Sequence, residues 1–181
     1  MTSKAAATDT IPAAPPLGVA LGGFMGVGKS TVGRAVALAL GLPFQDLDAL
    51  VVDRAGGRRI PEIFAQQGED VFRAREASAL RAACEAPSHV LALGGGTLHQ
   101  RGAVRQLERA FVVVVLDLPW PIIAARLAGD TTRPLARDAP RLFAERAAGY
   151  AAAGATVSAL GSVDDVAARV TAAWRRGCGS M

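Results

Sequence analysis

Cysteine, lysine and aromatic residues are scarce in this sequence, and long apolar runs are missing. Its 181 residues include two cysteines, Cys84 and Cys178, which are too few for a disulfide framework and fit a reducing compartment. The longest apolar run, 111–116, is closed by Asp117, whereas a membrane-spanning helix needs about 20 apolar residues. The N-terminus also lacks the basic start and apolar stretch of a signal peptide. We therefore expect a cytoplasmic protein that does not bind a membrane.

Positive charge is in excess but is not concentrated in any one segment. Lysines and arginines number 20 against 16 aspartates and glutamates, and no run of like charges occurs. The only lysines are Lys4 and Lys29, and Lys4 lies in a segment without periodicity, so Lys29 is the one lysine expected in the folded body. A small polyanion such as a nucleoside triphosphate explains this balance at least as well as nucleic acid. We expect no nucleic-acid partner.

Short apolar runs alternate with helical patterns from residue 17 onward. Val and Leu fill these runs with little polar alternation, which is typical of parallel strands buried on both faces. The expected strands cover 18–24, 43–47, 90–93, 111–118 and 155–160, and the expected helices cover 30–40, 48–55, 60–67, 69–86, 101–109, 121–128, 140–153 and 163–176. Ser162 and Asp165 predict a capping box for the last helix. This alternation predicts an α/β sandwich over residues 17–181, preceded by a flexible tail at 1–16.

A glycine-rich segment after the first expected strand carries the strongest functional signal. Residues 23–30, Gly-Phe-Met-Gly-Val-Gly-Lys-Ser, fit the pattern G-x-x-x-x-G-K-[ST]. Glycines allow backbone N–H groups to turn inward around phosphate oxygens, and the following helix directs its positive end at them. Lys29 should bridge the β- and γ-phosphates, and the Ser30 hydroxyl should ligate Mg²⁺. The segment predicts a nucleoside triphosphate site, but alone it does not specify the acceptor.

Acidic residues end the second expected strand, and glycines end the third. Asp46 and Asp48 lie where the carboxyl end of a parallel sheet meets the ligand crevice. The alternative is that Asp48 serves only as the N-cap of the next helix. Residues 94–96 are three consecutive glycines, which either a tight turn or the close approach of backbone to a ligand explains. The residues alone leave both alternatives open.

Arginines are the remaining candidates for binding a transferred phosphate or an anionic acceptor, although most arginines lie on solvated faces. The four candidates are Arg73, Arg126, Arg133 and Arg146. We expect His89 and His99 to be incidental, because no group of His and Cys has the spacing of metal ligands.

Taken together and in order, these motifs resemble the shikimate kinase family. The stretch 61–73, PEIFAQQGEDVFR, is the most specific, because a generic phosphate-loop kinase has no reason to carry it. The similarity extends from Gly22 to Tyr150, which is most of the chain expected to be ordered. The segments that carry it are 23–33, 46–48, 62–76, 93–96, 133–135 and 146–150.

The resemblance implies a three-layer α/β/α sandwich of the P-loop type with a five-stranded parallel sheet. It implies transfer of the γ-phosphoryl group of ATP to the 3-hydroxyl of shikimate, a step of aromatic amino-acid biosynthesis. ATP and shikimate would then be the partners and Mg²⁺ the cofactor, with Ser30 as a metal ligand and Asp46 near the metal through water.

The resemblance also implies roles for individual residues. Lys29, Asp48 and Arg133 would be catalytic, with Asp48 orienting or deprotonating the attacking hydroxyl and Arg133 arriving with a lid. The residues implied for ATP are Gly26, Val27, Gly28, Lys29, Ser30, Thr31, Arg126 and Arg133. The residues implied for shikimate are Asp48, Arg73, Gly94, Gly95, Gly96 and Arg146, with Phe64 and Phe72 shaping the pocket. Arg73 and Arg146 would hold the carboxylate of shikimate.

Two segments depart from the family's usual pattern. The stretch from Arg133 to Arg146 is several residues shorter, so the lid is reduced or the next helix starts sooner. Residues 161–163 lack the arginine-bearing loop that contacts adenine. The alternatives are a binding or regulatory module without turnover, and a kinase for gluconate or a nucleoside monophosphate. The residues implied for the acceptor are all present, which argues against the binding module. Two arginines that could hold one carboxylate argue against a kinase for gluconate or a nucleoside monophosphate. We expect a monomer.

Overall fold

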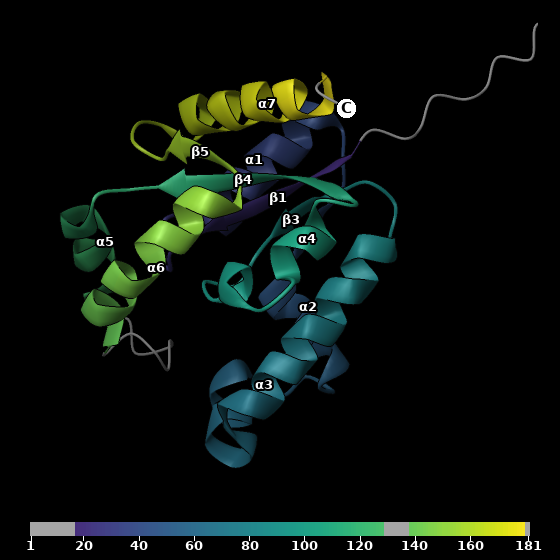
Figure 1. Ribbon diagram of the computed structural model, residues 1–181, viewed down its shortest axis with the longest axis vertical. Coiled ribbons are helices and arrows are strands. Elements are labelled where there is room, and N and C mark those ends of the chain that lie inside the picture. The colour runs from purple at the N-terminus through teal and green to yellow at the C-terminus, as the bar shows by residue number, and fades with distance from the viewer. Residues whose placement is uncertain (1–16, 129–137, 180–181) are drawn as a thin grey trace, which may run out of the picture.

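The core of the molecule is one sheet in which every strand pair is parallel. The computed structural model describes residues 17–128 and 138–179 (Figure 1). The strands follow the order β2-β3-β1-β4-β5 across the sheet. Their bounds are β1 Gly18–Gly23, β2 Phe44–Asp46, β3 Val90–Ala92, β4 Phe111–Asp117 and β5 Ala155–Ser158.

Helices cover both faces of this sheet. Their bounds are α1 Lys29–Leu40, α2 Leu47–Arg54, α3 Ile60–Glu85, α4 Ala103–Leu107, α5 Trp120–Leu127, α6 Ala139–Ala153 and α7 Val163–Gly179, with a 3-10 turn, η1, at Thr97–His99. Helices α1 and α7 pack together on one face, and α4 and α6 lie on the other (Figure 1). The predicted three-layer α/β/α sandwich with five parallel strands is therefore confirmed.

The central strands are buried on both faces, as their composition predicts. All six residues of β1 are buried, and Val19, Ala20 and Leu21 are fully buried. Burial of a side chain such as Leu21 contributes about 1.5–3 kcal/mol. The edge strand β5 is mostly exposed, with Val157 as its buried residue. The continuous apolar pattern therefore belongs to the strands that helices cover on two sides.

Glycines and caps set several helix ends where the sequence predicts them. Gly68 has a φ of 81° and interrupts α3 between the two helices expected at 60–67 and 69–86. The capping box of α7 is present, because Ser162 Oγ accepts from the Asp165 N–H at 3.2 Å and Oδ2 of Asp165 accepts from the Ser162 N–H at 3.3 Å. The expectation for 101–109 is too long, since Gly102, with a φ of 82°, precedes a helix of five residues. The turn η1 was not predicted.

The strand register brings three chain segments to one edge of the sheet. Ala92 of β3 pairs with Leu21 of β1 on one side and with Asp46 of β2 on the other. Because all three strands run in the same direction, the segments that follow them meet at the carboxyl edge. These segments are the glycine-rich loop, the start of α2 and the three glycines.

Gly33 lies inside α1 and offers a test of how tightly this layer packs on the sheet. A Cβ there would lie 2.5 Å from Cε2 of Phe44 and 3.3 Å from Cδ1 of Leu21. Helix propensity alone predicts that Gly33→Ala stabilises by about 0.5–1 kcal/mol, whereas overpacking predicts a loss of about 1–3 kcal/mol. We expect the loss, measured by urea unfolding. Ala39→Gly, at an exposed position of α1, is the control that measures helix propensity alone. A Gly33→Ala protein more stable than the native one would contradict tight packing of α1 on the sheet.

Candidate active site

The loop between β1 and α1 has the conformation that phosphate binding needs. Gly26 and Gly28 have φ values of 80° and 103°, in the left-handed region that favours glycine. Helix α1 begins at Lys29, directly after Gly28, so its first N–H groups and the positive end of its dipole lie at the loop. The loop therefore forms a cradle for an anion at a helix N-terminus.

Polar side chains at this loop are held by specific bonds. The Lys29 ammonium donates to the carbonyl oxygens of Gly23 at 2.9 Å and Phe24 at 3.0 Å. Ser30 Oγ donates to Oδ2 of Asp46 at 2.6 Å. Oδ1 of Asp46 accepts from the Asp48 N–H at 3.0 Å, so Asp46 is the N-cap of α2. The alternative in which Asp48 serves as this cap is wrong.

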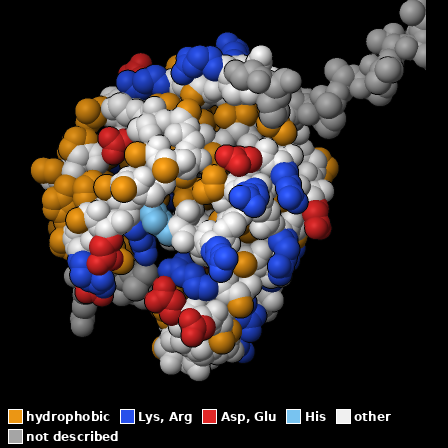
Figure 2. Space-filling view, in the orientation of Figure 1, with side chains coloured by type: hydrophobic (Ala, Val, Ile, Leu, Met, Phe, Trp, Pro, Cys, Tyr) orange, Lys and Arg blue, Asp and Glu red, His pale blue; other side chains and the backbone are white. Residues whose placement is uncertain are grey.

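A cavity of about 430 Å³ opens at this edge of the sheet. The glycine-rich loop, the start of α2, helix α3, the glycines after β3 and helix α6 form its wall. In Figure 2, the visible face of the molecule has a hollow with Lys and Arg side chains around it. Most of the predicted site residues line this one cavity: Gly26, Gly28, Lys29, Ser30, Thr31, Asp46, Asp48, Phe64, Phe72, Arg73, Gly94, Gly95, Gly96 and Arg146.

Arg73 is held in the wall by two carboxylates of its own helix. Its Nη1 donates to Glu76 at 2.7 Å, and its Nε and Nη2 donate to Glu69 at 3.1 Å and 2.9 Å. Burial alone would lower the pKa of Arg73, but the bonds to Glu76 and Glu69 outweigh it and raise that pKa above its ordinary value. The guanidinium is therefore a fixed positive charge facing the cavity.

Glu76 lies at the centre of a network that joins α3 to the segment 97–100. Its side chain is fully buried, and besides Arg73 it accepts from Thr97 Oγ1 at 2.6 Å and from the Gln100 amide. A buried carboxylate is stable only when several donors satisfy it. The network therefore fixes α3 to the turn η1, and through Arg73 it shapes the cavity wall.

Side chains that pack closely against the segment 94–96 explain why it contains glycines. A Cβ on Gly94 would collide with Oε1 of Glu76 and lie 3.1 Å from Oδ1 of Asp48. A Cβ on Gly96 would lie 2.8 Å from Nη1 of Arg73. A turn is present, since the Thr97 N–H donates to the Gly94 carbonyl oxygen at 3.2 Å, but none of these glycines has the positive φ that would require glycine in it. The close approach of side chains is what requires glycine at 94 and 96.

Helix α6 contributes Arg146 to the wall, and Tyr150 lies one turn further along the same helix. Arg146 Nη1 donates to the carbonyl oxygen of Gly95 at 3.1 Å, and the Tyr150 hydroxyl donates to the same oxygen. Burial raises the pKa of Tyr150 to about 12, so the phenol stays protonated near neutral pH. Burial lowers the pKa of His99, which contacts the Arg146 carbonyl, and the charge of Arg146 acts in the same direction.

An aromatic pair gives the cavity an apolar side. The rings of Phe64 and Phe72 are 4.7 Å apart between centroids and tilted by 39°. The Arg73 guanidinium carbon lies 5.1 Å from the centre of the Phe72 ring. This arrangement combines a flat apolar surface with fixed positive charge, which suits a small ring that carries a carboxylate.

Two predicted residues within the described ranges, Val27 and Arg126, lie outside this wall. The Val27 side chain is buried beneath the loop. Arg126, on α5, donates through Nη1 to the carbonyl oxygens of Gly26 at 3.1 Å and Val27 at 3.4 Å, so its charge lies against the outer side of the loop. Arg133 lies outside the described residues, as does most of the segment between Arg133 and α6 where a lid is expected.

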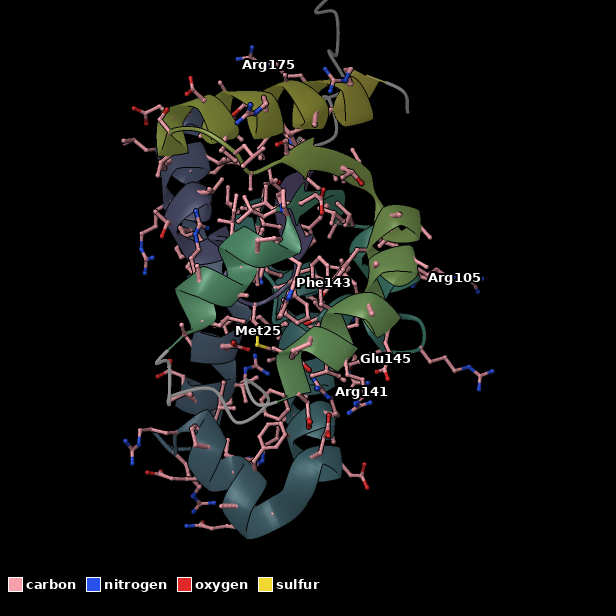
Figure 3. The ribbon with its side chains drawn as sticks, turned by 90° about the vertical axis from the view of Figure 1, so that its left-hand side faces the viewer. Met25, Arg105, Arg141, Phe143, Glu145 and Arg175 are labelled. Atoms are coloured by element: carbon pink, nitrogen blue, oxygen red, sulfur yellow. The ribbon has the colours of Figure 1, made fainter. Side chains whose placement is uncertain are left out.

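The sequence predictions missed four residues of the wall: Met25, Ile60, Glu76 and Leu93. Figure 3 shows Met25 in the middle of the molecule, next to the half of α6 that carries Arg141 and Phe143. Glu76 had a signal in the sequence, because a carboxylate three residues after Arg73 lies on the same side of a helix. The three apolar residues had none beyond their position next to motif residues.

The oxygen atoms of Ser30 and Asp46 fit a magnesium ion bound together with a nucleotide. A hydroxyl and a carboxylate lie 2.6 Å apart at the head of α1, and Mg²⁺ prefers oxygen ligands, of which the protein supplies one or two beside phosphates and water. In residues 17–128 and 138–179, no group of three or more His, Cys, Asp or Glu side chains is placed to hold a metal ion. The donors therefore suit a metal that arrives with its phosphates.

Comparisons with known proteins agree with this geometry. A family model described as "Shikimate kinase" matches residues 25–172. The shikimate kinase of Geobacter metallireducens is 40% identical over 173 residues, which cover 91% of this chain and 96% of that protein.

Solved structures agree as well. A shikimate kinase from Acinetobacter baumannii in complex with shikimate matches with a TM-score of 0.80 at 32% identity, over 86% of this chain and 90% of that one. A gluconokinase from Sinorhizobium meliloti 1021 has a TM-score of 0.64 at 19% identity, over 91% and 95% of the two chains, and shows the shared fold alone. The match to the family model and the identity over nearly the whole chain lead to one conclusion: this chain belongs to the shikimate kinase family.

Proposed function

We propose that this protein transfers the γ-phosphoryl group of ATP to the 3-hydroxyl of shikimate, which yields shikimate 3-phosphate and ADP. One observation carries the proposal: a single cavity is lined by a phosphate-binding loop, by Asp48, and by the two arginines Arg73 and Arg146. A phosphoryl donor and a small carboxylic acid can therefore lie next to each other in one cavity. Proximity of this kind is a large part of phosphoryl-transfer catalysis.

The donor half of the cavity is assigned to ATP. The loop N–H groups and the N-terminus of α1 would hold the β- and γ-phosphates, with Lys29 bridging them. The ammonium is already held at the loop by the carbonyl oxygens of Gly23 and Phe24. Arg126 would add positive charge from the outer side of the loop, and Arg133 would neutralise charge on the transferred group.

Magnesium is assigned to Ser30 and Asp46. The short contact between the Ser30 hydroxyl and the Asp46 carboxylate supports this assignment. When bound, the ion would neutralise phosphate charge and orient the γ-phosphoryl group.

The acceptor half is assigned to shikimate. Arg73 and Arg146 would bind its carboxylate through the two parallel N–H bonds that a guanidinium offers. Phe64 and Phe72 would pack on the ring, and the backbone of residues 94–96 would contact its hydroxyl groups. Asp48 would accept the proton of the 3-hydroxyl while that oxygen forms a bond to the γ-phosphorus and the bond to ADP breaks.

Cytoplasmic location and a monomeric state belong to the same proposal. Cys84 and Cys178 are both free thiols, which suits a reducing compartment. Within the described ranges, no helix is both long enough and apolar enough to cross a membrane. Gel filtration of the purified protein measures the oligomeric state directly.

ADP release from MgATP tests the proposed reaction with shikimate, gluconate and a nucleoside monophosphate as acceptors. Of the three acceptors, we expect only shikimate to support turnover, and we expect no turnover when Mg²⁺ is left out. Asp48→Asn should lower kcat by about 10²–10⁴-fold, the range for losing a general base, while equilibrium ATP binding persists.

Two results would contradict this proposal. Turnover with gluconate or the nucleotide in place of shikimate would mean that the arginines do not select the acceptor. ATP binding without ADP release for every acceptor would favour a binding module.

Arg146→Lys tests the carboxylate assignment, because lysine keeps the charge but loses the paired N–H geometry. We expect the KM for shikimate to rise by about tenfold, which equals about 1.4 kcal/mol, with an unchanged KM for ATP. Arg141→Lys is the matched control on the same helix, since Arg141 is exposed and pairs with Glu145 at 2.8 Å. An unchanged KM for shikimate in Arg146→Lys would show that this arginine does not bind the acid.

Glu76→Gln tests whether the buried carboxylate positions Arg73. The amide keeps the volume of Glu76 but loses its charge, so the bond to Arg73 Nη1 weakens and Arg73 is held mainly by Glu69. We expect a raised KM for shikimate, a nearly unchanged KM for ATP, and a loss of about 1–3 kcal/mol in the free energy of unfolding. Glu69→Gln, at the exposed partner of the same arginine, should have a smaller effect on both. Equal effects on the two KM values would mean that Glu76 acts on overall stability alone.

A further inference from the structure

Helix α6 is tied to the segment 94–99 by side chains from both sides. From α6, Arg146 Nη1 and the Tyr150 hydroxyl both donate to the carbonyl oxygen of Gly95. From the other side, Nε2 of His99 lies 3.1 Å from the carbonyl oxygen of Arg146. Arg146, whose side chain lines the cavity, is thus also held through its own backbone.

The contact of His99 defines both its tautomer and its orientation. A carbonyl oxygen only accepts, so Nε2 carries the hydrogen and donates to Arg146. The His99 ring also stands edge-on to the Tyr150 ring, with centroids 4.7 Å apart and an angle of 88° between the planes. His99 is therefore fixed at two points on α6, one turn apart.

Gly149 provides a second, independent observation. A glycine inside a helix is unfavourable relative to alanine, and Gly149 does not have the positive φ that would require it. A Cβ at this position would lie 2.6 Å from Nε2 and 2.9 Å from Cδ2 of His99. The missing Cβ is what allows the His99 ring to reach the backbone of α6.

We propose that His99 is a positioning residue for Arg146, acting by fastening the backbone of α6 to the turn η1. The inference rests on the proposed function, in which Arg146 binds the carboxylate of the acceptor. When the Arg146 guanidinium turns from the Gly95 carbonyl to that carboxylate, the bonds from His99 and Tyr150 still hold the helix. His99 sets where the guanidinium is presented, so it governs acceptor affinity more than the phosphoryl-transfer step.

Three substitutions separate the hydrogen bond from the packing of the ring. His99→Phe keeps an aromatic ring against Tyr150 but has no donor, and His99→Ala has neither. His99→Gln keeps an N–H donor of similar reach. We expect the KM for shikimate to rise by about threefold to tenfold in the first two, with a smaller change in kcat and an unchanged KM for ATP. His99→Gln should restore most of the affinity.

Gly149→Ala completes a double-mutant cycle. In the native background the added methyl group would displace the His99 ring, so the KM for shikimate should rise as it does in His99→Phe. In the His99→Ala background the same methyl group enters vacated space, and it should cause no further rise. Additive effects, or an unchanged KM in His99→Ala, would overturn the proposal.

A readout without shikimate separates this proposal from the proposed function. Failure of the native protein to turn over shikimate would refute the proposed function alone. The guanidinium resonance of Arg146 in ¹⁵N–¹H spectra should shift in His99→Phe and keep its native position in His99→Gln. An Arg146 resonance that does not respond to either substitution would overturn the positioning role, whatever the acceptor is.

Discussion

A buried carboxylate in the wall of the cavity needs several donors, and the packing of α3 against the segment 97–100 follows from that need. Glu76 is fully buried and accepts from Arg73, Thr97 and Gln100. An ionised carboxylate without such donors would be too costly to bury. Satisfying it joins the middle of α3 to η1, and its volume excludes any side chain at position 94. The acceptor half is therefore preorganised before a ligand arrives.

The two halves of the cavity are built by segments that follow different strands of the parallel sheet. The loop after β1 offers backbone N–H groups and Lys29 to a polyanion, while the segments after β2 and β3 offer carboxylates and close backbone. Helix α6 lies on the acceptor side. Its bonds to Gly95 connect it to the sheet through the three glycines that follow β3. Positive charge thus lies on both sides of the point where the phosphoryl group would pass, which favours transfer of a charged group.

Local chemistry made much of the molecule predictable. The strands, the break at Gly68 and the capping box at Ser162 depend on nearby residues, and the structure has each of them. The choice between Asp46 and Asp48 as the cap of α2 is also local, since Asp46 accepts from the N–H two residues on, and the sequence allowed either residue. The turn η1 is different, because it depends on bonds to Glu76, more than 20 residues away. Short-range patterns do not carry such information.

The sequence by itself determined the fold class, the phosphate loop and the family, because these rest on periodicity and on motifs of adjacent residues. It also named most of the residues that line the cavity. Only the tertiary structure decided why residues 94 and 96 are glycines, which segment the Glu76 carboxylate joins to α3, and what His99 contacts. The physical reason is the same in each case. Side chains from helices far apart in the chain meet on one loop, and their distances depend on how those helices pack on the sheet.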